Sequence, residues 1–380
     1  MQEERKLALR NIIQRNNLAG LIFWRPDELV LTLAYFPHWG ASFLVYREDE
    51  AVLFVPETEP EDILPEGVRI IKYPWGIIGC PDPWSNLYNK IRDVLPDKGV
   101  HKLPVSFVKN IGGSALSRTS AEQPPLPQDL VERLSAISEG GYKDCSPELL
   151  DLYAYKTSED IVSLELTHHV AARAVEAFYK NAGSGRTESS VAASVESSVQ
   201  EMVGEQRVRF ARAWAMIQSG RNTAWGGTYN RSTGKKLGPG EMVLMELAVC
   251  VNGYWADITR MAQTPGVSAR QLNVINVVSE AQALAISMMK PGINMGDLDA
   301  VARNHIGRSG FGHLFNHALG HQVGFRYHDP GAGLSPGSDA VLREGMVLTV
   351  EPGIYGIEIE CGARVEDNIL ITADGYRVLS

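Results

Sequence analysis

The first 152 residues alternate apolar and polar blocks in a pattern typical of a small α/β domain. Apolar side chains recur at helical spacing over residues 2–17, and a second helix is predicted over about 84–94. Short apolar runs predict strands, and the charged residues 47–50 between two of these runs indicate a β-hairpin. The predicted strands are residues 20–24, 43–46, 51–55, 68–73 and 102–108. We therefore expect residues 1–152 to form an α/β domain with a mixed sheet.

Longer helical patterns alternate with β-hairpins in the rest of the chain. Thr157 or Ser158 is placed to cap the first helix, and Ser268 with Gln271 forms a capping box before the third. The predicted helices cover about residues 158–183, 187–203, 268–289 and 296–308. The predicted strands are 213–219, 242–251, 253–261, 347–350, 354–360 and 364–372. We expect residues 153–380 to form an α+β domain in which helices cover one face of an antiparallel sheet.

Charge and composition exclude several classes of partner. The chain has 36 basic and 45 acidic residues, a net charge of -9, and no run rich in Lys and Arg. Nucleic acids and anionic membranes are therefore not expected as partners, because phosphate binding needs concentrated basic side chains. No apolar run is long enough to span a membrane, and the N-terminus does not resemble a signal peptide. Four scattered cysteines without a C-x-x-C pair indicate free thiols and a cytoplasmic location.

Two carboxylates interrupt apolar strands in the second half of the chain. Glu246 lies within the run 242–249, and Asp257 follows eleven residues later. A hairpin that turns near Asn252 would bring the two side chains together. Buried carboxylates need a cation. That cation is either a partner in a buried ion pair, Arg260 or Arg364, or a metal ion.

Histidines and further acids follow in the same half of the chain. Four of the nine histidines fall between residues 313 and 328, among them His317, His321 and His328. Glu351 ends an apolar strand, and Glu366 again lies within a strand. Three histidines at this spacing are unlike ordinary core residues, and neighbouring glycines allow the backbone to approach a site closely.

Taken in order, these segments resemble the pita-bread hydrolases, which include methionine aminopeptidase, aminopeptidase P, prolidase and creatinase. The matching motifs are G-Y-x-x-D-I-T-R, H-x-x-G-H-x-x-G followed by H-D-P-G, T-V-E-P-G-I-Y and R-V-E-D-N. The resemblance covers the C-terminal domain with specific motifs. It covers the N-terminal domain in outline, since a domain of this size and strand content is similar to that of the creatinase and prolidase branch.

The resemblance implies a metal-dependent hydrolase. The metal ligands of the family correspond here to Glu246, Asp257, His321, Glu351 and Glu366. Four carboxylates and one imidazole suit two divalent ions such as Mn²⁺, Co²⁺, Fe²⁺ or Zn²⁺, which activate a water molecule for attack on a carbonyl. Glu351 would then carry the proton to the leaving nitrogen.

The same resemblance gives roles to residues around the ligands. His317 and His328 resemble the histidines that stabilise the tetrahedral intermediate on the substrate side. Thr259 and Arg364 correspond to residues that orient the ligands.

This sequence departs from the family pattern at two positions. Glu246 stands where the family has Asp, and its extra methylene moves the carboxylate by about 1.5 Å. Gly227 stands where the peptidases carry a histidine about five residues after the equivalent of Asn222. Nearby, Trp225 and Tyr229 either line an apolar or cation-binding substrate pocket or simply pack.

Three functions are compatible with these features. The first is a metallopeptidase of the Xaa-Pro dipeptidase type, acting on short peptides. The second is a creatinase-like hydrolase of non-peptide C–N bonds that works with few or no metals, which both departures favour. The third is a catalytically silent binding protein with the same fold. Membership of the prolidase and creatinase branch also implies a homodimer.

Overall fold

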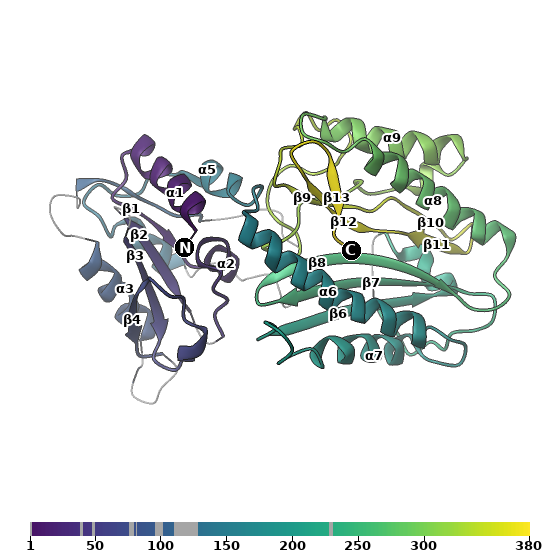
Figure 1. The fold of residues 1–380 in the computed structure, drawn as a ribbon, viewed down its shortest axis with the longest axis horizontal. Coiled ribbons are helices and arrows are strands. Elements are labelled where there is room, and N and C mark those ends of the chain that lie inside the picture. The colour runs from purple at the N-terminus through teal and green to yellow at the C-terminus, as the bar shows by residue number, and fades with distance from the viewer. Residues whose placement is uncertain are drawn as a thin grey trace. The chain divides into compact units, whose positions relative to one another are not determined.

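The computed structural model describes residues 2–38, 41–47, 50–75, 80, 82–95, 102–109, 128–227 and 231–380. The chain divides into two compact units, Met1–Tyr153 and Ala154–Ser380. Figure 1 shows each unit as its own arrangement of helices around strands.

The first unit is built on a five-stranded sheet with the order β4-β3-β2-β1-β5. The strands are β1 Gly20–Phe23, β2 Phe43–Arg47, β3 Glu50–Pro56, β4 Arg69–Tyr73 and β5 Val105–Ser106. Strands β1, β2 and β3 pair antiparallel, whereas β4 and β5 add in parallel. The predicted mixed sheet is therefore confirmed, and so is the hairpin, whose last pair joins Arg47 to Glu50.

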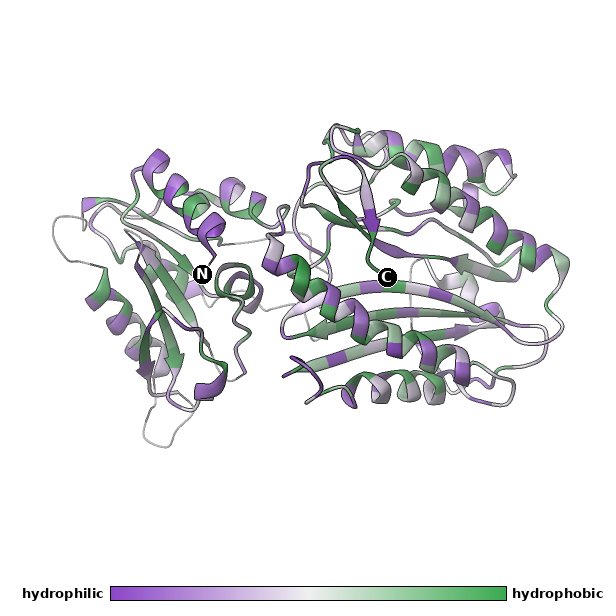
Figure 2. Cartoon of the chain, in the orientation of Figure 1, coloured by the Kyte–Doolittle hydropathy of each residue, from purple (hydrophilic) through white to green (hydrophobic). Residues whose placement is uncertain are grey.

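Five helices surround this sheet in the described residues of the first unit. They are α1 Glu3–Asn16, α2 Pro26–Leu33, α3 Pro83–Val94, α4 Gln128–Ser135 and α5 Ser146–Asp151. Two of these were predicted, at residues 2–17 and 84–94. The helix α2 was not, because it is too short and too apolar to show a helical period. In Figure 2 the strands of this unit are mainly hydrophobic, whereas the helices carry mixed colours, as expected of helices with one buried face.

The second unit contains three small sheets. One is antiparallel, with the order β6-β7-β8: β6 Ala211–Ser219, β7 Met242–Val251 and β8 Tyr254–Gln263. The next has the order β13-β12-β9, formed by β9 Val347–Val350, β12 Asp367–Ile371 and β13 Tyr376–Val378. The last is the hairpin of β10 Gly353–Gly356 and β11 Cys361–Arg364.

Two pairs of helices cover these sheets. Helices α6 Ser158–Asn181 and α7 Glu188–Gln200 share one hydrophobic core with β6, β7 and β8. Helices α8 Ala269–Ser287 and α9 Met295–Arg308 share a second core with strands β9 to β12. Figure 1 shows the two pairs on opposite sides of the strands, so that the strands form the middle of the unit. The α+β class is confirmed, although the strands form three sheets and not one.

The N-terminal ends of the helices follow the predicted caps. The Thr157 hydroxyl accepts a hydrogen bond from the Asp160 N–H, and the Asp160 carboxylate accepts one from the Thr157 N–H. Ser268 and Gln271 form the same reciprocal arrangement at α8. Each arrangement satisfies N–H groups that have no partner within the helix.

Two strand predictions were wrong. Residues 364–372 do not form one strand, because the chain leaves β11 after Arg364 and enters β12, in a different sheet, at Asp367. Residues 354–360 form only the short β10 followed by a turn. Among the described residues, no helix is both long and apolar enough to cross a membrane.

Candidate metal centre

The β7–β8 hairpin supplies the first two carboxylates. Asn252 and Gly253 both have positive φ, 51° and 92°, which suits the tight turn that joins antiparallel strands. Glu246 lies directly opposite Thr259, and Asp257 lies opposite Ala248. Since side chains alternate along a strand, all four project from the same face. The two carboxylates are thus diagonal neighbours on one face, and the hairpin brings them together as predicted.

Glu366 enters the site from the break between β11 and β12. Its backbone N–H donates to the Thr259 carbonyl at 3.2 Å, which fixes Glu366 to the edge of β8. The Thr259 hydroxyl donates to Glu366 Oε2 at 2.7 Å and accepts from Arg364 Nε at 2.8 Å. Arg364 therefore orients Glu366 through Thr259.

His321 is placed by the strand that ends in Glu351. A Cβ at Gly320 would lie 2.0 Å from the Thr349 carbonyl oxygen, so only glycine allows this approach of the two chains. The Thr349 side chain contacts the His321 N–H at 3.0 Å. His321 Nδ1 lies 2.9 Å from the Gln322 carbonyl and donates to it, which leaves Nε2 directed into the site.

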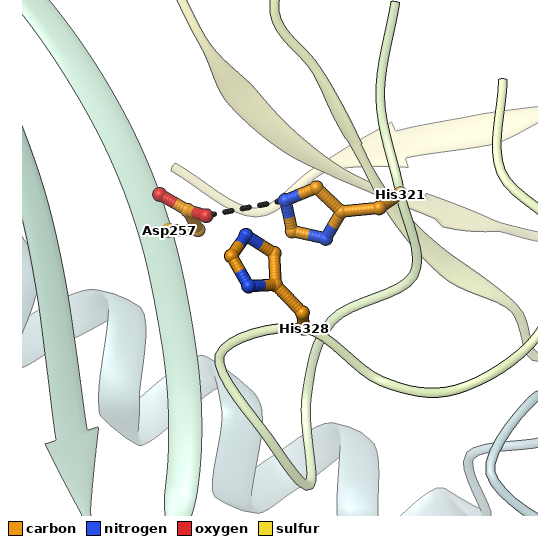
Figure 3. A group of neighbouring side chains, drawn as sticks. All are labelled: Asp257, His321 and His328. Carbon is orange, nitrogen blue, oxygen red and sulfur yellow. Dashed lines mark ion pairs between the residues drawn. The ribbon is translucent and has the colours of Figure 1, made fainter. Parts of the chain in front are cut away.

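His321 Nε2 lies 3.4 Å from Asp257 Oδ2 and 3.5 Å from Glu351 Oε1. Figure 3 shows the rings of His321 and His328 next to each other beside the Asp257 carboxylate. The centres of the two rings are 4.1 Å apart.

The side chains form three overlapping groups of possible metal ligands. Asp257, His321 and His328 make one group, and His321, Glu351 and Glu366 make another. The third contains Glu246, Asp257 and Glu366. Within each group the ligand atoms lie within 4.8 Å of one another. The five residues that the sequence indicated as ligands are therefore all brought together, and His328 joins them.

Burial and mutual repulsion make this cluster require a cation. Burial, reinforced by the charges of Glu366 and Glu351, raises the pKa of Asp257 well above its ordinary value. Burial and Glu366 do the same for the pKa of Glu351. Burial also raises the pKa of Glu366, although Arg364 opposes this shift. In the described part of the chain, Asp257 Oδ1 and Glu366 Oε1 are buried without a hydrogen-bond partner. These orphaned oxygens fit divalent metal ions.

The histidine chemistry agrees with metal binding. Burial lowers the pKa of His321 to about 4, so that the ring is neutral at neutral pH. A neutral imidazole is the form that ligates metals. Burial also lowers the pKa of His317.

Glu246 has protein partners of its own. The Arg364 guanidinium contacts its Oε2, and the Tyr327 hydroxyl donates to its Oε1. The ion pair with Arg364 that the sequence offered as an alternative to a metal is therefore present. Arg260 instead pairs with Asp367, at 2.7 Å. The structure thus combines an ion pair and a possible metal ligand at Glu246.

His317 lies outside the three ligand groups. Its Nε2 is 3.2 Å from the Tyr355 hydroxyl, which also accepts a hydrogen bond from Arg364 Nη1 at 2.9 Å. Sequence reasoning did not single out Tyr355 or Tyr327, although both stand inside the histidine and glutamate segments. Their hydroxyls reach the site only through tertiary contacts.

The position that lacks the family's histidine is tightly packed. A Cβ at Gly227 would lie 2.6 Å from Asn316 Oδ1 and 2.7 Å from the Tyr355 ring. No larger side chain fits there without movement of Tyr355.

Beside this position, a cavity of about 240 Å³ is lined by Gln218, Asn222, Trp225, Arg231 and Thr233. Trp225 therefore lines a cavity, together with the polar side chains of Gln218, Asn222 and Thr233 and with Arg231. Tyr229 lies outside the described residues.

Comparison with known proteins finds similarity along the whole chain. A model of metallopeptidase family M24 matches residues 163–373, in the second unit. A Xaa-Pro dipeptidase of Pyrococcus furiosus is 30% identical over 379 residues, which cover 100% of this chain and 98% of that protein. A Xaa-Pro dipeptidase of Pyrococcus horikoshii is 35% identical over 258 residues, 67% of this chain and 71% of that protein. The crystal structure of the prolidase from Pyrococcus horikoshii OT3 superposes with a TM-score of 0.80 at 25% identity, covering 99% and 98% of the two chains.

Proposed function

The chain belongs to metallopeptidase family M24, and from this premise we propose that it hydrolyses Xaa-Pro dipeptides in a metal-dependent reaction. The observation that carries the proposal is the cluster of buried carboxylates around a neutral imidazole, with two orphaned oxygens. Two relatives with similarity over two thirds or more of the chain are named Xaa-Pro dipeptidases. They favour this function over a non-peptide C–N hydrolase or a silent binding protein.

Two ions are proposed, held by Glu246, Asp257, His321, Glu351 and Glu366. The ligand groups overlap in Asp257, His321 and Glu366, as expected where neighbouring ions share ligands. Carboxylate and imidazole ligands suit Mn²⁺, Co²⁺, Fe²⁺ or Zn²⁺, and Mn²⁺ is our choice because oxygen ligands predominate. His328 is a candidate for a further ligand, since it belongs to the group of Asp257 and His321.

The remaining chemistry is assigned to side chains. When bound, the ions supply a nucleophilic water and polarise the substrate carbonyl. Glu351 accepts a proton from the attacking water and passes it to the leaving nitrogen. His328 donates a hydrogen bond to the carbonyl oxygen as charge develops on it. His317 Nδ1 lies 2.8 Å from the Ala318 carbonyl and donates to it, so His317 donates to the substrate through Nε2 only in its protonated form. Tyr355 holds His317 in place through its hydroxyl.

The proposal is tested by measuring the metal content of the purified protein and its activity on dipeptides. We expect purified protein to contain divalent metal by elemental analysis and to cleave Leu-Pro in the presence of Mn²⁺, with little cleavage of Leu-Ala. A Glu351→Gln variant should lose activity by about 10²- to 10⁴-fold, as expected when a general base is removed. Absence of both bound metal and Leu-Pro cleavage at millimolar Mn²⁺ would contradict the proposal.

Location and assembly are proposed separately. The four cysteines are free thiols in the structure, which supports a reducing, cytoplasmic location. A homodimer is proposed from the likeness to the prolidase and creatinase branch. Light scattering coupled to size exclusion measures the mass of the particle, and a mass of one chain would rule the dimer out.

A further inference from the structure

The outer edge of β8 carries the proposed ligand Asp257 and forms hydrogen bonds with Gly324, Asn368 and Glu366. At one end the Trp255 N–H donates to the Gly324 carbonyl at 2.8 Å. At the other end the Thr259 carbonyl accepts from the Glu366 N–H at 3.2 Å. Between them, the Asp257 N–H donates to a side chain, Asn368 Oδ1, at 3.1 Å. The backbone of the ligand Asp257 therefore depends on one amide side chain.

Asn368 acts here as a substitute for a neighbouring strand. Its Nδ2 donates to the Asp257 carbonyl at 2.6 Å, so that both polar backbone groups of Asp257 are bonded to the same amide. The side chain is completely buried. Because Oδ1 must accept and Nδ2 must donate in these two bonds, the orientation of the amide is fixed.

His168, on helix α6, completes this arrangement. Its Nε2 lies 2.9 Å from Asn368 Oδ1, and its Nδ1 lies 2.7 Å from the Leu164 carbonyl of the preceding helical turn. The Leu164 carbonyl and Asn368 Oδ1 are both acceptors, and burial lowers the pKa of His168, so the neutral ring has a single N–H for these two contacts. We place this hydrogen on Nε2, where it donates to Asn368 Oδ1. His168 is buried, at 5% exposure, so water does not compete for the contact.

We propose that His168 is a positioning residue that holds Asn368, and through it the backbone of Asp257, in the geometry that the metal centre requires. The inference rests on the proposed metal site. Partners one shell outside the ligands typically change metal affinity or activity by about 10- to 100-fold when they are removed. His168 lies 89 positions before Asp257 in the chain and contacts none of the proposed ligands directly.

Two substitutions separate the two contacts of His168. His168→Gln places an amide nitrogen where Nε2 lies and retains the hydrogen bond to Asn368. His168→Asn places its amide nitrogen where Nδ1 lies, so it contacts the Leu164 carbonyl and loses the bond to Asn368. His168→Leu removes both contacts at similar volume and should behave as the Asn variant. The neighbouring His169 is exposed on the same helix, so His169→Gln is a matched control.

Two measurements show how each substitution affects the Asp257 backbone and the binding of metal. Amide hydrogen exchange of residues 254–263, measured by mass spectrometry on metal-free protein, reports whether the Asp257 N–H is held. The free-ion signal of Mn²⁺ in electron paramagnetic resonance gives the dissociation constant of the metal. We expect the Asn and Leu variants to exchange faster in this segment and to bind Mn²⁺ at least about tenfold more weakly. The Gln and His169 variants should stay within about threefold of the native protein.

Equal behaviour of the Gln and Asn variants would overturn the inference, whether both match the native protein or both are impaired. If both match the native protein, the hydrogen bond of His168 to Asn368 does not position Asp257. If both are impaired, His168 acts by packing alone. If the native protein binds no Mn²⁺, the proposed function fails. The exchange experiment still decides whether His168 holds Asp257, because it needs no metal.

Discussion

Glu246 stands at a ligand position where the family has Asp, and this difference affects how tightly a metal ion can bind there. It is longer by one methylene than the Asp of the family pattern, and both of its oxygens contact protein groups, Arg364 and Tyr327. A metal ion has to compete with the Arg364 guanidinium for this carboxylate. The other ligands, Asp257 and Glu366, each retain a buried oxygen without a protein donor. The two proposed ions should therefore differ in affinity, with the ion nearest Glu246 bound more weakly.

Replacement of Glu246 should remove only the weaker ion. Glu246→Gln keeps the shape of the side chain and abolishes its charge, so we expect one Mn²⁺ per chain to be lost and the other to be retained. Glu246→Asp restores the family residue and withdraws it from Tyr327, so it should bind the second ion at least as tightly as the native protein. Equilibrium dialysis followed by elemental analysis counts the ions. Two ions of unchanged affinity in the Gln variant would show that Glu246 is no ligand.

At the scale of elements, helix starts were predictable and strand ends were not. The capping pairs Thr157 with Asp160 and Ser268 with Gln271 act within three residues, so the sequence alone reveals them. The break at Glu366 has no such local signal, because it depends on the pairing of Asp367 with Val350 in another sheet. Strand ends that are set by tertiary partners cannot be read from periodicity.

The loop that carries Tyr327 and His328 is held by a buried ion pair. Lys156 Nζ lies 2.9 Å from Asp329 Oδ2, with both side chains fully buried, and Asp329 Oδ1 accepts from the Arg326 N–H at 2.7 Å. This pair ties the loop to the segment that precedes α6. It therefore fixes two site residues from outside the metal centre.

Breaking this pair should be costly. Lys156→Met leaves Asp329 buried without its charge partner, and the expected loss of unfolding free energy is about 3–5 kcal/mol. The double variant Lys156→Met/Asp329→Asn removes the stranded charge and should regain part of that loss. Urea unfolding followed by circular dichroism measures both. A single variant as stable as the native protein would show that the pair contributes nothing to stability.

At the scale of the whole molecule, the proposed ligands come from four segments of the chain: the β7–β8 hairpin and the segments of His321, Glu351 and Glu366. The resemblance to a known family indicated Glu246, Asp257, His321, Glu351 and Glu366 as a set, but neither resemblance nor pattern gives distances. The contacts of Tyr327 with Glu246 and of Asn368 with Asp257 join residues 81 and 111 positions apart. Such contacts follow from the packing of sheets on one another, so the sequence predicted which residues form the site and not how they are held.

The metal centre also links function to stability in the second unit. Without metal, three buried carboxylates repel one another, and burial alone cannot stabilise their charges. Bound ions remove this repulsion, and any ligand that binds only the folded state stabilises it. Mn²⁺ should therefore raise the melting temperature of the native protein.

The same repulsion predicts that an inactive variant, Glu351→Gln, is more stable than the native protein when metal is absent. At mildly alkaline pH, Glu351→Gln should melt about 3–6 °C above the native protein when both are metal-free, because it removes one of the clustered charges. The rise in its melting temperature on adding Mn²⁺ should be smaller than that of the native protein, because a ligand is missing. Glu205→Gln removes an exposed carboxylate and changes the net charge equally. Its melting temperature should equal that of the native protein both without metal and with Mn²⁺. Differential scanning calorimetry with and without chelator makes the comparison. A metal-free Glu351→Gln protein that melts below the native one would show that Glu351 stabilises the fold through contacts and not only through the ions it binds.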